Sequence, residues 1–96
     1  MKIYIAGRIT GRNIDNARKQ FEHGESVVTG WGETPVNPMK LPHDHDKTWR
    51  SYMIECISEL VKCDAIFMLK GWNKSKGARL ELRIAKSLKL KIFWEQ

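Results

Sequence analysis

The sequence predicts an α/β protein: a Rossmann-like (flavodoxin-like) three-layer sandwich on a small parallel sheet of about four strands. Short apolar segments without polar alternation, such as residues 65–69, are typical of strands with both faces covered by helices. The stretches between such segments have helical spacing, for example Leu80, Ile84 and Leu88. Strands joined by helices imply parallel pairing through right-handed crossovers.

The expected elements alternate along the whole chain. After a first strand, Asn13 or Asp15 can cap a helix that ends at Gly30 and Gly32, and Asp46 or Thr48 opens a second helix. The apolar side of the first helix contains Ile14, Ala17, Phe21 and Val28, and that of the second contains Trp49, Met53, Cys56, Ile57, Leu60 and Val61. The expected strands are residues 1–6, 34–37, 65–69 and 91–94, and the third helix is residues 78–88.

Length and composition indicate one small soluble domain, residues 1–96. No apolar run reaches the roughly 18 residues of a membrane span, and no signal peptide is recognisable, so we expect a cytoplasmic protein without a membrane partner. Cys56 and Cys63 lie in one helical segment with their Cα atoms about 10 Å apart, too far for a disulfide. A chain this short buries roughly 60–70% of its unfolded surface. We therefore expect a homodimer or higher homo-oligomer, formed through the second helix around Trp49, Tyr52 and Met53.

The net charge of +6 and the pI near 9.6 indicate an anionic partner. Phosphorylated small molecules, nucleic acid and solubility alone are all compatible with this charge. The basic residues are spread along the chain and accompany no nucleic-acid motif, which argues against nucleic-acid binding.

The segment at residues 64–81 carries the main candidate for chemistry. Gly71 and Gly77 bracket a polar loop between the third strand and the third helix. In α/β units, ligands bind where the carboxyl end of a strand meets the amino end of the next helix. Glu81 lies just inside that helix, where the helix dipole favours its ionised form, so it is a candidate nucleophile. The alternative is that this glutamate only stabilises the helix, by roughly 0.3–1 kcal/mol.

The loop after the first strand carries two glycines, Gly7 and Gly11, and two arginines, Arg8 and Arg12. It matches neither a dinucleotide-binding G-x-G-x-x-G pattern nor a Walker A loop. Arginine before a helix N-terminus suits bidentate recognition of phosphate. The alternative is a pair of solvated arginines in a surface turn.

Fragments along nearly the whole chain resemble the DUF4406 group of the nucleoside 2-deoxyribosyltransferase-like superfamily. Their order and spacing carry the resemblance more than any single fragment does; they are residues 2–7, 35–38, 49–53, 63–64 and 71–81. The resemblance implies a Rossmann-like fold and chemistry at C1′ of a deoxyribonucleoside. It also implies that the ligand is a nucleoside or nucleotide, that no cofactor or metal is needed, and that Asn37 contacts the substrate.

The resemblance also implies roles for single residues. Glu81 matches the glutamate that attacks C1′ and releases the base, following the logic of retaining glycosidases. Tyr4 matches the tyrosine that positions the glutamate or the sugar. Ser75 and Gly77 match the pattern before that glutamate, and serine at this position resembles the branch that hydrolyses deoxynucleoside 5′-monophosphates, where it contacts phosphate. That branch also has a Gly-x-Ile-x-Gly-x-Arg loop, which matches Gly7, Ile9, Gly11 and Arg12.

Two departures from the family pattern bear on activity. Arg8 replaces the proline or serine that is usual after the first-strand glycine. Cys56 stands where the family commonly has an aspartate associated with protonation of the leaving base, and protonation helps a purine to leave. Glu55 is adjacent but points about 100° away around the helix.

Two further features have a functional and a structural interpretation. The run from His43 to Asp46 alternates histidine and aspartate, but it lacks a third metal ligand at a recognisable spacing, so we expect capping and turn roles for its aspartates. Its histidines could border the ligand pocket. Trp72 is a candidate to stack on a base, and the alternative is packing at the sheet edge.

The sequence thus supports two main hypotheses. The first is an N-glycosidase or deoxyribosyltransferase-like enzyme acting on a deoxynucleotide, with Glu81 as nucleophile and Tyr4 orienting it. The second is a nucleotide-binding protein on the same scaffold that sequesters or senses its ligand without turnover. Glu81 with Ser75 and Gly77 favours the first hypothesis, and Cys56 favours the second.

Overall fold

The computed structural model describes residues 1–41 and 48–96 and confirms the predicted α/β sandwich. Its sheet is parallel, with the strand order β2-β1-β3-β4. Two short 3₁₀ turns, η1 and η2, are additions that the sequence analysis did not predict. The elements are β1 (Lys2–Ala6), α1 (Ile14–Gly30), β2 (Thr34–Val36), η1 (Pro38–Lys40), α2 (Trp49–Leu60), β3 (Ala65–Met68), η2 (Trp72–Lys74), α3 (Lys76–Ser87) and β4 (Lys91–Trp94).

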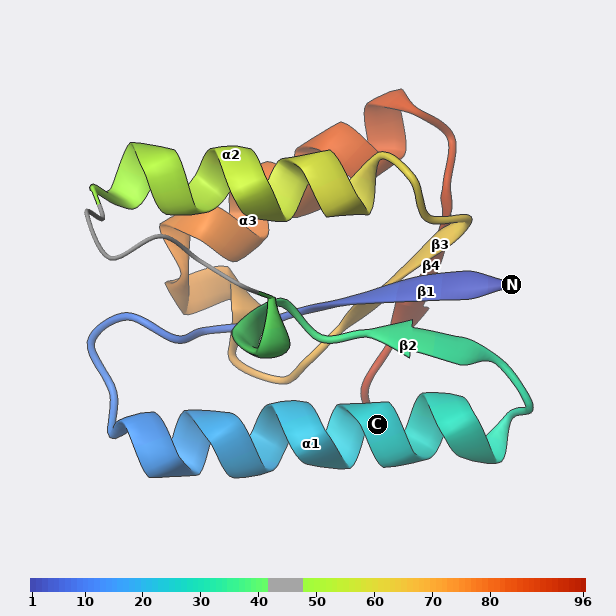
Figure 1. Ribbon diagram of the computed structural model, residues 1–96, viewed down its shortest axis with the longest axis horizontal. Coiled ribbons are helices and arrows are strands. Elements are labelled where there is room, and N and C mark those ends of the chain that lie inside the picture. The colour runs from blue at the N-terminus through green and yellow to red at the C-terminus, as the bar shows by residue number, and fades with distance from the viewer. Residues whose placement is uncertain (42–47) are drawn as a thin grey trace.

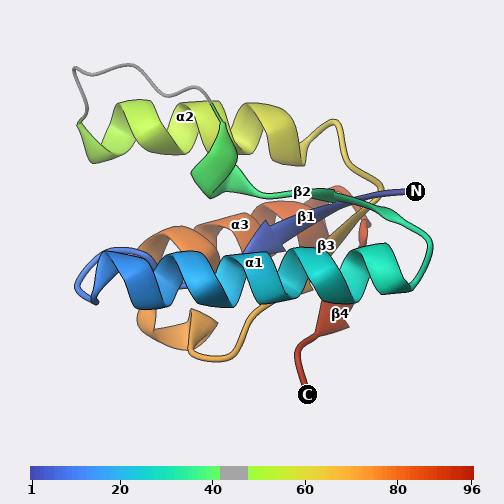
Figure 2. The same ribbon diagram turned by 60° about the horizontal axis from the view of Figure 1, so that its bottom comes forward.

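The helices cover the sheet from both sides (Figures 1 and 2). Helix α1 lies on one face, and α2 and α3 lie together on the other face. Successive residues of a strand point to opposite faces. Ile3 and Ile5 of β1 therefore pack towards α1, whereas Tyr4 and Ala6 pack towards α2 and α3. This alternation places the buried Tyr4 in the middle of the sheet, facing α3.

Each helix begins at a residue whose side chain accepts hydrogen bonds from the free N–H groups of the first turn. The Oδ1 atom of Asn13 accepts from the N–H of Asp15 at 2.9 Å and from that of Asn16 at 3.1 Å. Thr48 caps α2 and Ser75 caps α3 in the same way, each with a bond of 3.1 Å. The predicted starts at Asn13 and Thr48 are confirmed, and α3 begins two residues before its predicted start because Ser75 caps it.

The buried helix faces differ in part from the predicted ones. Ile14, Trp49 and Val61 are exposed rather than inward-facing. In α3 the leucine and isoleucine stripe that predicts the helix lies beside its buried face, which consists of Ala78, Glu81, Leu82 and Ala85. The alanines lie against the sheet because short side chains let the helix axis approach it closely. Glu81 is therefore brought into the protein interior.

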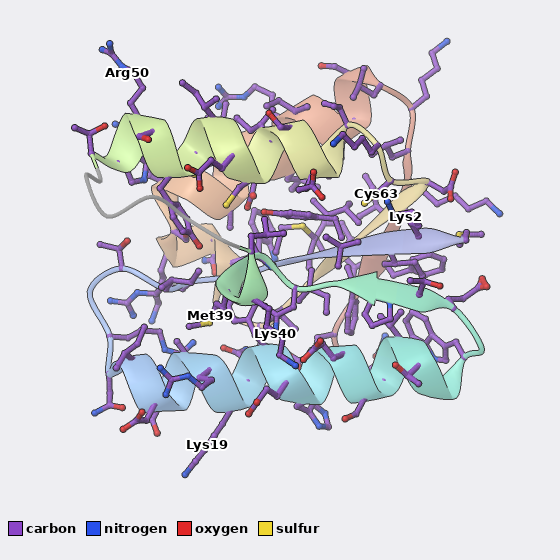
Figure 3. The ribbon with its side chains drawn as sticks, in the orientation of Figure 1. Lys2, Lys19, Met39, Lys40, Arg50 and Cys63 are labelled. Carbon is purple, nitrogen blue, oxygen red and sulfur yellow. The ribbon has the colours of Figure 1, made fainter. Side chains whose placement is uncertain are left out.

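Charged side chains project away from the core on both outer faces. Lys19 points outward from α1 and Arg50 points outward from α2, on opposite sides of the molecule (Figure 3). Both cysteines are free and buried, and Cys63 lies near Lys2 at the amino-terminal end of β1. Within residues 1–41 and 48–96, no helix is long and apolar enough to cross a membrane.

Gly7 allows the loop after β1 to pack closely on the core. A Cβ atom at this position would lie 2.9 Å from Cδ1 of Leu69 and 3.2 Å from Cζ of Phe21. Gly7→Ala is therefore expected to lower the free energy of unfolding by about 1–3 kcal/mol, the cost of overpacking.

The control for this prediction is Gly30→Ala, because no atom lies within 4 Å of the added Cβ. Urea denaturation of both variants compares the two sites. Equal stability of Gly7→Ala and Gly30→Ala would show that the close packing at Gly7 has no energetic importance.

Candidate active site

A cavity of about 420 Å³ opens at the carboxyl-terminal edge of the sheet. Its walls come from the loop after β1, the first turns of α2 and the loop that leads into α3. Figure 1 shows why these segments meet: the carboxyl end of β1 and the amino ends of α2 and α3 lie at the same end of the molecule. Its volume is in the range of small-molecule sites.

Tyr4 and Glu81 form the buried centre of this cavity. The phenol of Tyr4 donates a short hydrogen bond to Oε2 of Glu81. Tyr4 has no exposed surface, and Glu81 is only 5% exposed. The bond joins the central strand to the second turn of α3, so the two residues that the sequence analysis named as catalytic are brought together.

The environment of Glu81 raises its pKa to about 7, mainly because burial disfavours the charged form. The hydrogen bond from Tyr4 acts in the opposite direction. The expectation that the helix dipole holds Glu81 ionised is therefore wrong. Glu81 lies in the second turn of α3, beyond the first turn to which the dipole effect is largely limited, and the cost of burial is larger.

Neutral groups from α2 surround this pair. The thiol of Cys56 lies against the phenols of Tyr4 and Tyr52, and burial raises the pKa of this thiol to about 11. Burial also raises the pKa of Tyr4 and that of Tyr52 above their usual range. At neutral pH these three side chains are uncharged, and Glu81 is the member of the cluster that titrates.

Ser75 and Gly77 shape the start of α3 at the cavity wall. The Oγ atom of Ser75 accepts from the N–H of Ala78, so this hydroxyl caps the helix and keeps its own proton for another partner. A Cβ atom at Gly77 would lie 3.0 Å from Sδ of Met53. The absence of a side chain at Gly77 thus lets α2 and α3 approach each other beside Glu81.

The structure does not place the two arginines of the first loop in the cavity wall. Arg8 donates to the carbonyl oxygen of Gly11 at 3.0 Å. Arg12 donates to the side chain of Gln20 and to the carbonyl oxygen of Arg8. Gly7 and Ile9 do line the cavity, whereas Gly11 does not and has a positive φ of 81°.

Two other predicted substrate contacts also lie off the cavity wall. Trp72 packs against Trp94 with ring centroids 5.6 Å apart, which is the packing role at the sheet edge. Asn37 is buried, and its Oδ1 atom accepts from the N–H of Met39 at 2.9 Å and starts η1. Its Nδ2 atom is buried, and within the described part of the chain no hydrogen-bond partner reaches it.

The cavity lining also includes residues that were not predicted to bind a ligand, among them Trp49, Tyr52, Lys74 and Lys76. Trp49 and Tyr52 were expected at a dimer interface, and no role was predicted for the two lysines. Lys74 and Lys76 flank Ser75, which was itself predicted to bind the ligand, and this adjacency was the available signal.

No group of three histidine, cysteine or acidic side chains that could hold a metal ion occurs within residues 1–41 and 48–96. The run from His43 to Asp46 lies outside the described residues.

The sequence places the chain in a family. The family model for DUF4406, a domain of unknown function, matches residues 1–94. The chain belongs to the DUF4406 family. No curated protein matches this DUF4406 sequence.

The fold of this DUF4406 protein also occurs in solved structures of enzymes. A 2-desoxiribosyltransferase from Leishmania mexicana superposes with a TM-score of 0.72 at 21% identity, over 97% of this chain and 62% of that one. A 2-deoxyribosyltransferase from Bacillus psychrosaccharolyticus superposes with a TM-score of 0.74 at 18% identity, over 98% of this chain and 71% of that one. The chain thus shares their fold and spans less than two thirds of the Leishmania enzyme.

The raised pKa of Glu81 predicts how stability depends on pH. The folded state holds the proton of Glu81 up to a pKa of about 7, whereas the unfolded state releases it near 4.5. The stabilising contribution of the protonated carboxyl is therefore complete below pH 4.5 and is lost as the pH rises through 7. The free energy of unfolding of Glu81→Gln, measured relative to that of the wild type, should therefore increase by up to about 3 kcal/mol as the pH rises from 5 to 8.

Urea denaturation at several pH values measures this difference. Glu22→Gln, which removes an exposed carboxylate from α1, controls for the change in net charge. A constant difference between the wild type and Glu81→Gln across this pH range would show that the pKa of Glu81 is not raised.

Proposed function

We propose that this protein is an N-glycosidase or deoxyribosyltransferase-like enzyme that cleaves the N-glycosidic bond of a deoxynucleotide. The observation that carries this proposal is the buried Glu81 carboxyl, held by the phenol of Tyr4 inside a cavity at the carboxyl edge of the sheet. Two proteins that share the fold are named as 2-deoxyribosyltransferases, which supports the reaction class.

In the proposed reaction, an ionised Glu81 oxygen attacks C1′ of the 2-deoxyribose. The C1′–N bond breaks, and its electron pair leaves with the base, which takes up a proton from solvent. Water then attacks C1′ of the glycosyl ester, the ester C1′–O bond breaks to restore the Glu81 carboxylate, and the attacking water gives up a proton to solvent, which leaves the free sugar. A second base that attacks in place of water and loses its own N–H proton gives transfer. The displacement needs no cofactor, because the carboxylate, the sugar and the acceptor supply every bond that forms.

Tyr4 orients the nucleophile in this scheme. Its hydrogen bond fixes one oxygen of Glu81 and lowers the pKa of a carboxyl that burial has raised. With a pKa of about 7, a large fraction of Glu81 is ionised at neutral pH. The ionised form of Glu81 is therefore populated at neutral pH, and it is weakly solvated, which makes a carboxylate a more reactive nucleophile.

The second candidate function is binding of a nucleotide without turnover. Cys56 favours it, because a buried thiol with a pKa of about 11 is a poor acid for the departing base. The two functions differ in one measurement: the enzyme releases free base from a bound ligand, and the binding protein does not.

Incubation with the four deoxynucleoside 5′-monophosphates, followed by chromatography, should detect free base. Glu81→Gln should reduce the release by at least about a thousandfold, since the covalent route loses its nucleophile. Glu59→Gln on α2 is the matched control, because Glu59 pairs with Lys62 and does not line the cavity. Base release by Glu81→Gln at the wild-type rate would remove Glu81 from the mechanism, and binding without release by the wild type would favour the second function.

We also propose that the protein assembles as a homodimer through α2. The surface differs from the predicted one, since Met53 is buried within the chain, and Trp49 and Tyr52 line the cavity. Besides Trp49, the exposed apolar side chains here are Ile54 of α2, which is 59% exposed, and Val61, which follows the helix.

Light scattering should give twice the 11.2 kDa mass of one chain at micromolar concentration. Ile54→Glu should give the mass of one chain, because a charge in an apolar interface is left unpaired. Leu88→Glu, at another exposed apolar side chain after α3, controls for added surface charge. A wild-type mass of 11.2 kDa would refute the dimer.

A further inference from the structure

Two lysines border the cavity that contains Glu81. Lys74 ends η2, Lys76 begins α3, and both line the cavity. Other lysines of the protein are paired, for example Lys40 with Glu25 at 2.8 Å and Lys62 with Glu59 at 3.0 Å. No ion pair within residues 1–41 and 48–96 involves Lys74 or Lys76.

Lys76 is held at the cavity by an aromatic side chain instead of an acid. Its Nζ atom lies 4.6 Å from the ring centroid of Trp49, which also lines the cavity. A cation–π contact of this kind leaves the N–H donors of the ammonium group available to a further partner. The cation is therefore positioned without being neutralised.

The placement of the lysines relative to Glu81 fits one end of a nucleotide. Lys76 precedes Glu81 by five residues of the same helix, about 7.5 Å along its axis. Glu81 is buried and both lysines are exposed, so a sugar whose C1′ faces Glu81 can place its 5′ substituent beside the lysines. The hydroxyl of Ser75 lies between them in the chain.

The arginines of the first loop do not compete for this role in the structure. The guanidinium groups of Arg8 and Arg12 are bonded to the Gly11 carbonyl and to Gln20, and neither lines the cavity. Within the described residues, the cationic side chains that line the cavity are Lys74 and Lys76.

We propose that Lys74 and Lys76 recognise a phosphomonoester on the 5′ carbon of the ligand, so that the substrate class is the deoxynucleoside 5′-monophosphate. This inference rests on the proposed function and assigns the charge recognition to lysines rather than to Arg8 and Arg12. A second consequence follows from the positions of the charges. The lysines screen the repulsion between the bound phosphate and the ionised Glu81, which would otherwise oppose ionisation of the nucleophile.

The test measures binding by calorimetry in the Glu81→Gln background, so that no turnover interferes. The probes are the four deoxynucleosides, their 5′-monophosphates and a 5′-phosphorylated single-stranded oligodeoxynucleotide. Each monophosphate that binds should bind at least about tenfold more tightly than its nucleoside. Lys74→Gln/Lys76→Gln should abolish that preference and leave nucleoside affinity unchanged.

Two double variants serve as controls. Lys86→Gln/Lys91→Gln removes the same charge from exposed positions outside the cavity lining and should keep the preference. Arg8→Gln/Arg12→Gln should also keep it. If the arginine variant loses the preference and the lysine variant keeps it, the assignment is overturned.

The remaining outcomes separate this inference from the proposed function. Equal affinity for nucleoside and monophosphate, with base still released by the wild type, would overturn the phosphate site and leave the proposed function intact. Tighter binding of the oligodeoxynucleotide than of every monophosphate would overturn the mononucleotide substrate class. Failure to bind or cleave any probe would overturn both.

Discussion

The hydrogen bond between Tyr4 and Glu81 is the interaction on which the site depends. It connects the middle strand of the sheet with the helix that carries the carboxyl, inside a layer otherwise filled by apolar side chains. A buried carboxyl without a partner is costly, and its pKa would be raised further. The bond thus reduces the free-energy cost of burying Glu81 and limits the rise of its pKa to about 7. A site with these properties carries a stability cost at neutral pH, which is common for functional residues.

The cavity separates charge in a way that suits the proposed deoxynucleotide ligand. Its inner wall is neutral apart from Glu81, because the thiol of Cys56 and the nearby phenols keep their protons. Its outer part holds the cations of Lys74 and Lys76. Under the proposed function, a ligand with an anionic end and an electrophilic carbon would be oriented by its charge before the carboxylate attacks.

The sequence was sufficient to predict the fold and the central pair, but not the surroundings of that pair. Apolar strands and helical periodicity are local signals, and Tyr4 and Glu81 lie in fragments that resemble a known family. The directions of Arg8 and Arg12 depend on the conformation of one loop and on a contact with Gln20, which no local pattern encodes. Likewise, a stripe of leucine and isoleucine predicted the third helix, but the face of this helix that lies on the sheet contains its alanines. Small side chains allow the helix to pack closely on the sheet, and this preference is not visible in a pattern of large apolar residues.

The most direct test of the account is to identify the atom that attacks C1′. The wild-type protein would be incubated with a deoxynucleotide analogue bearing fluorine at C2′, which slows hydrolysis of a glycosyl ester, and then digested and analysed by mass spectrometry. The account predicts one glycosyl adduct, on the peptide containing Glu81, and none in Glu81→Gln. Release of base without a protein adduct, or an adduct on another residue, would contradict it.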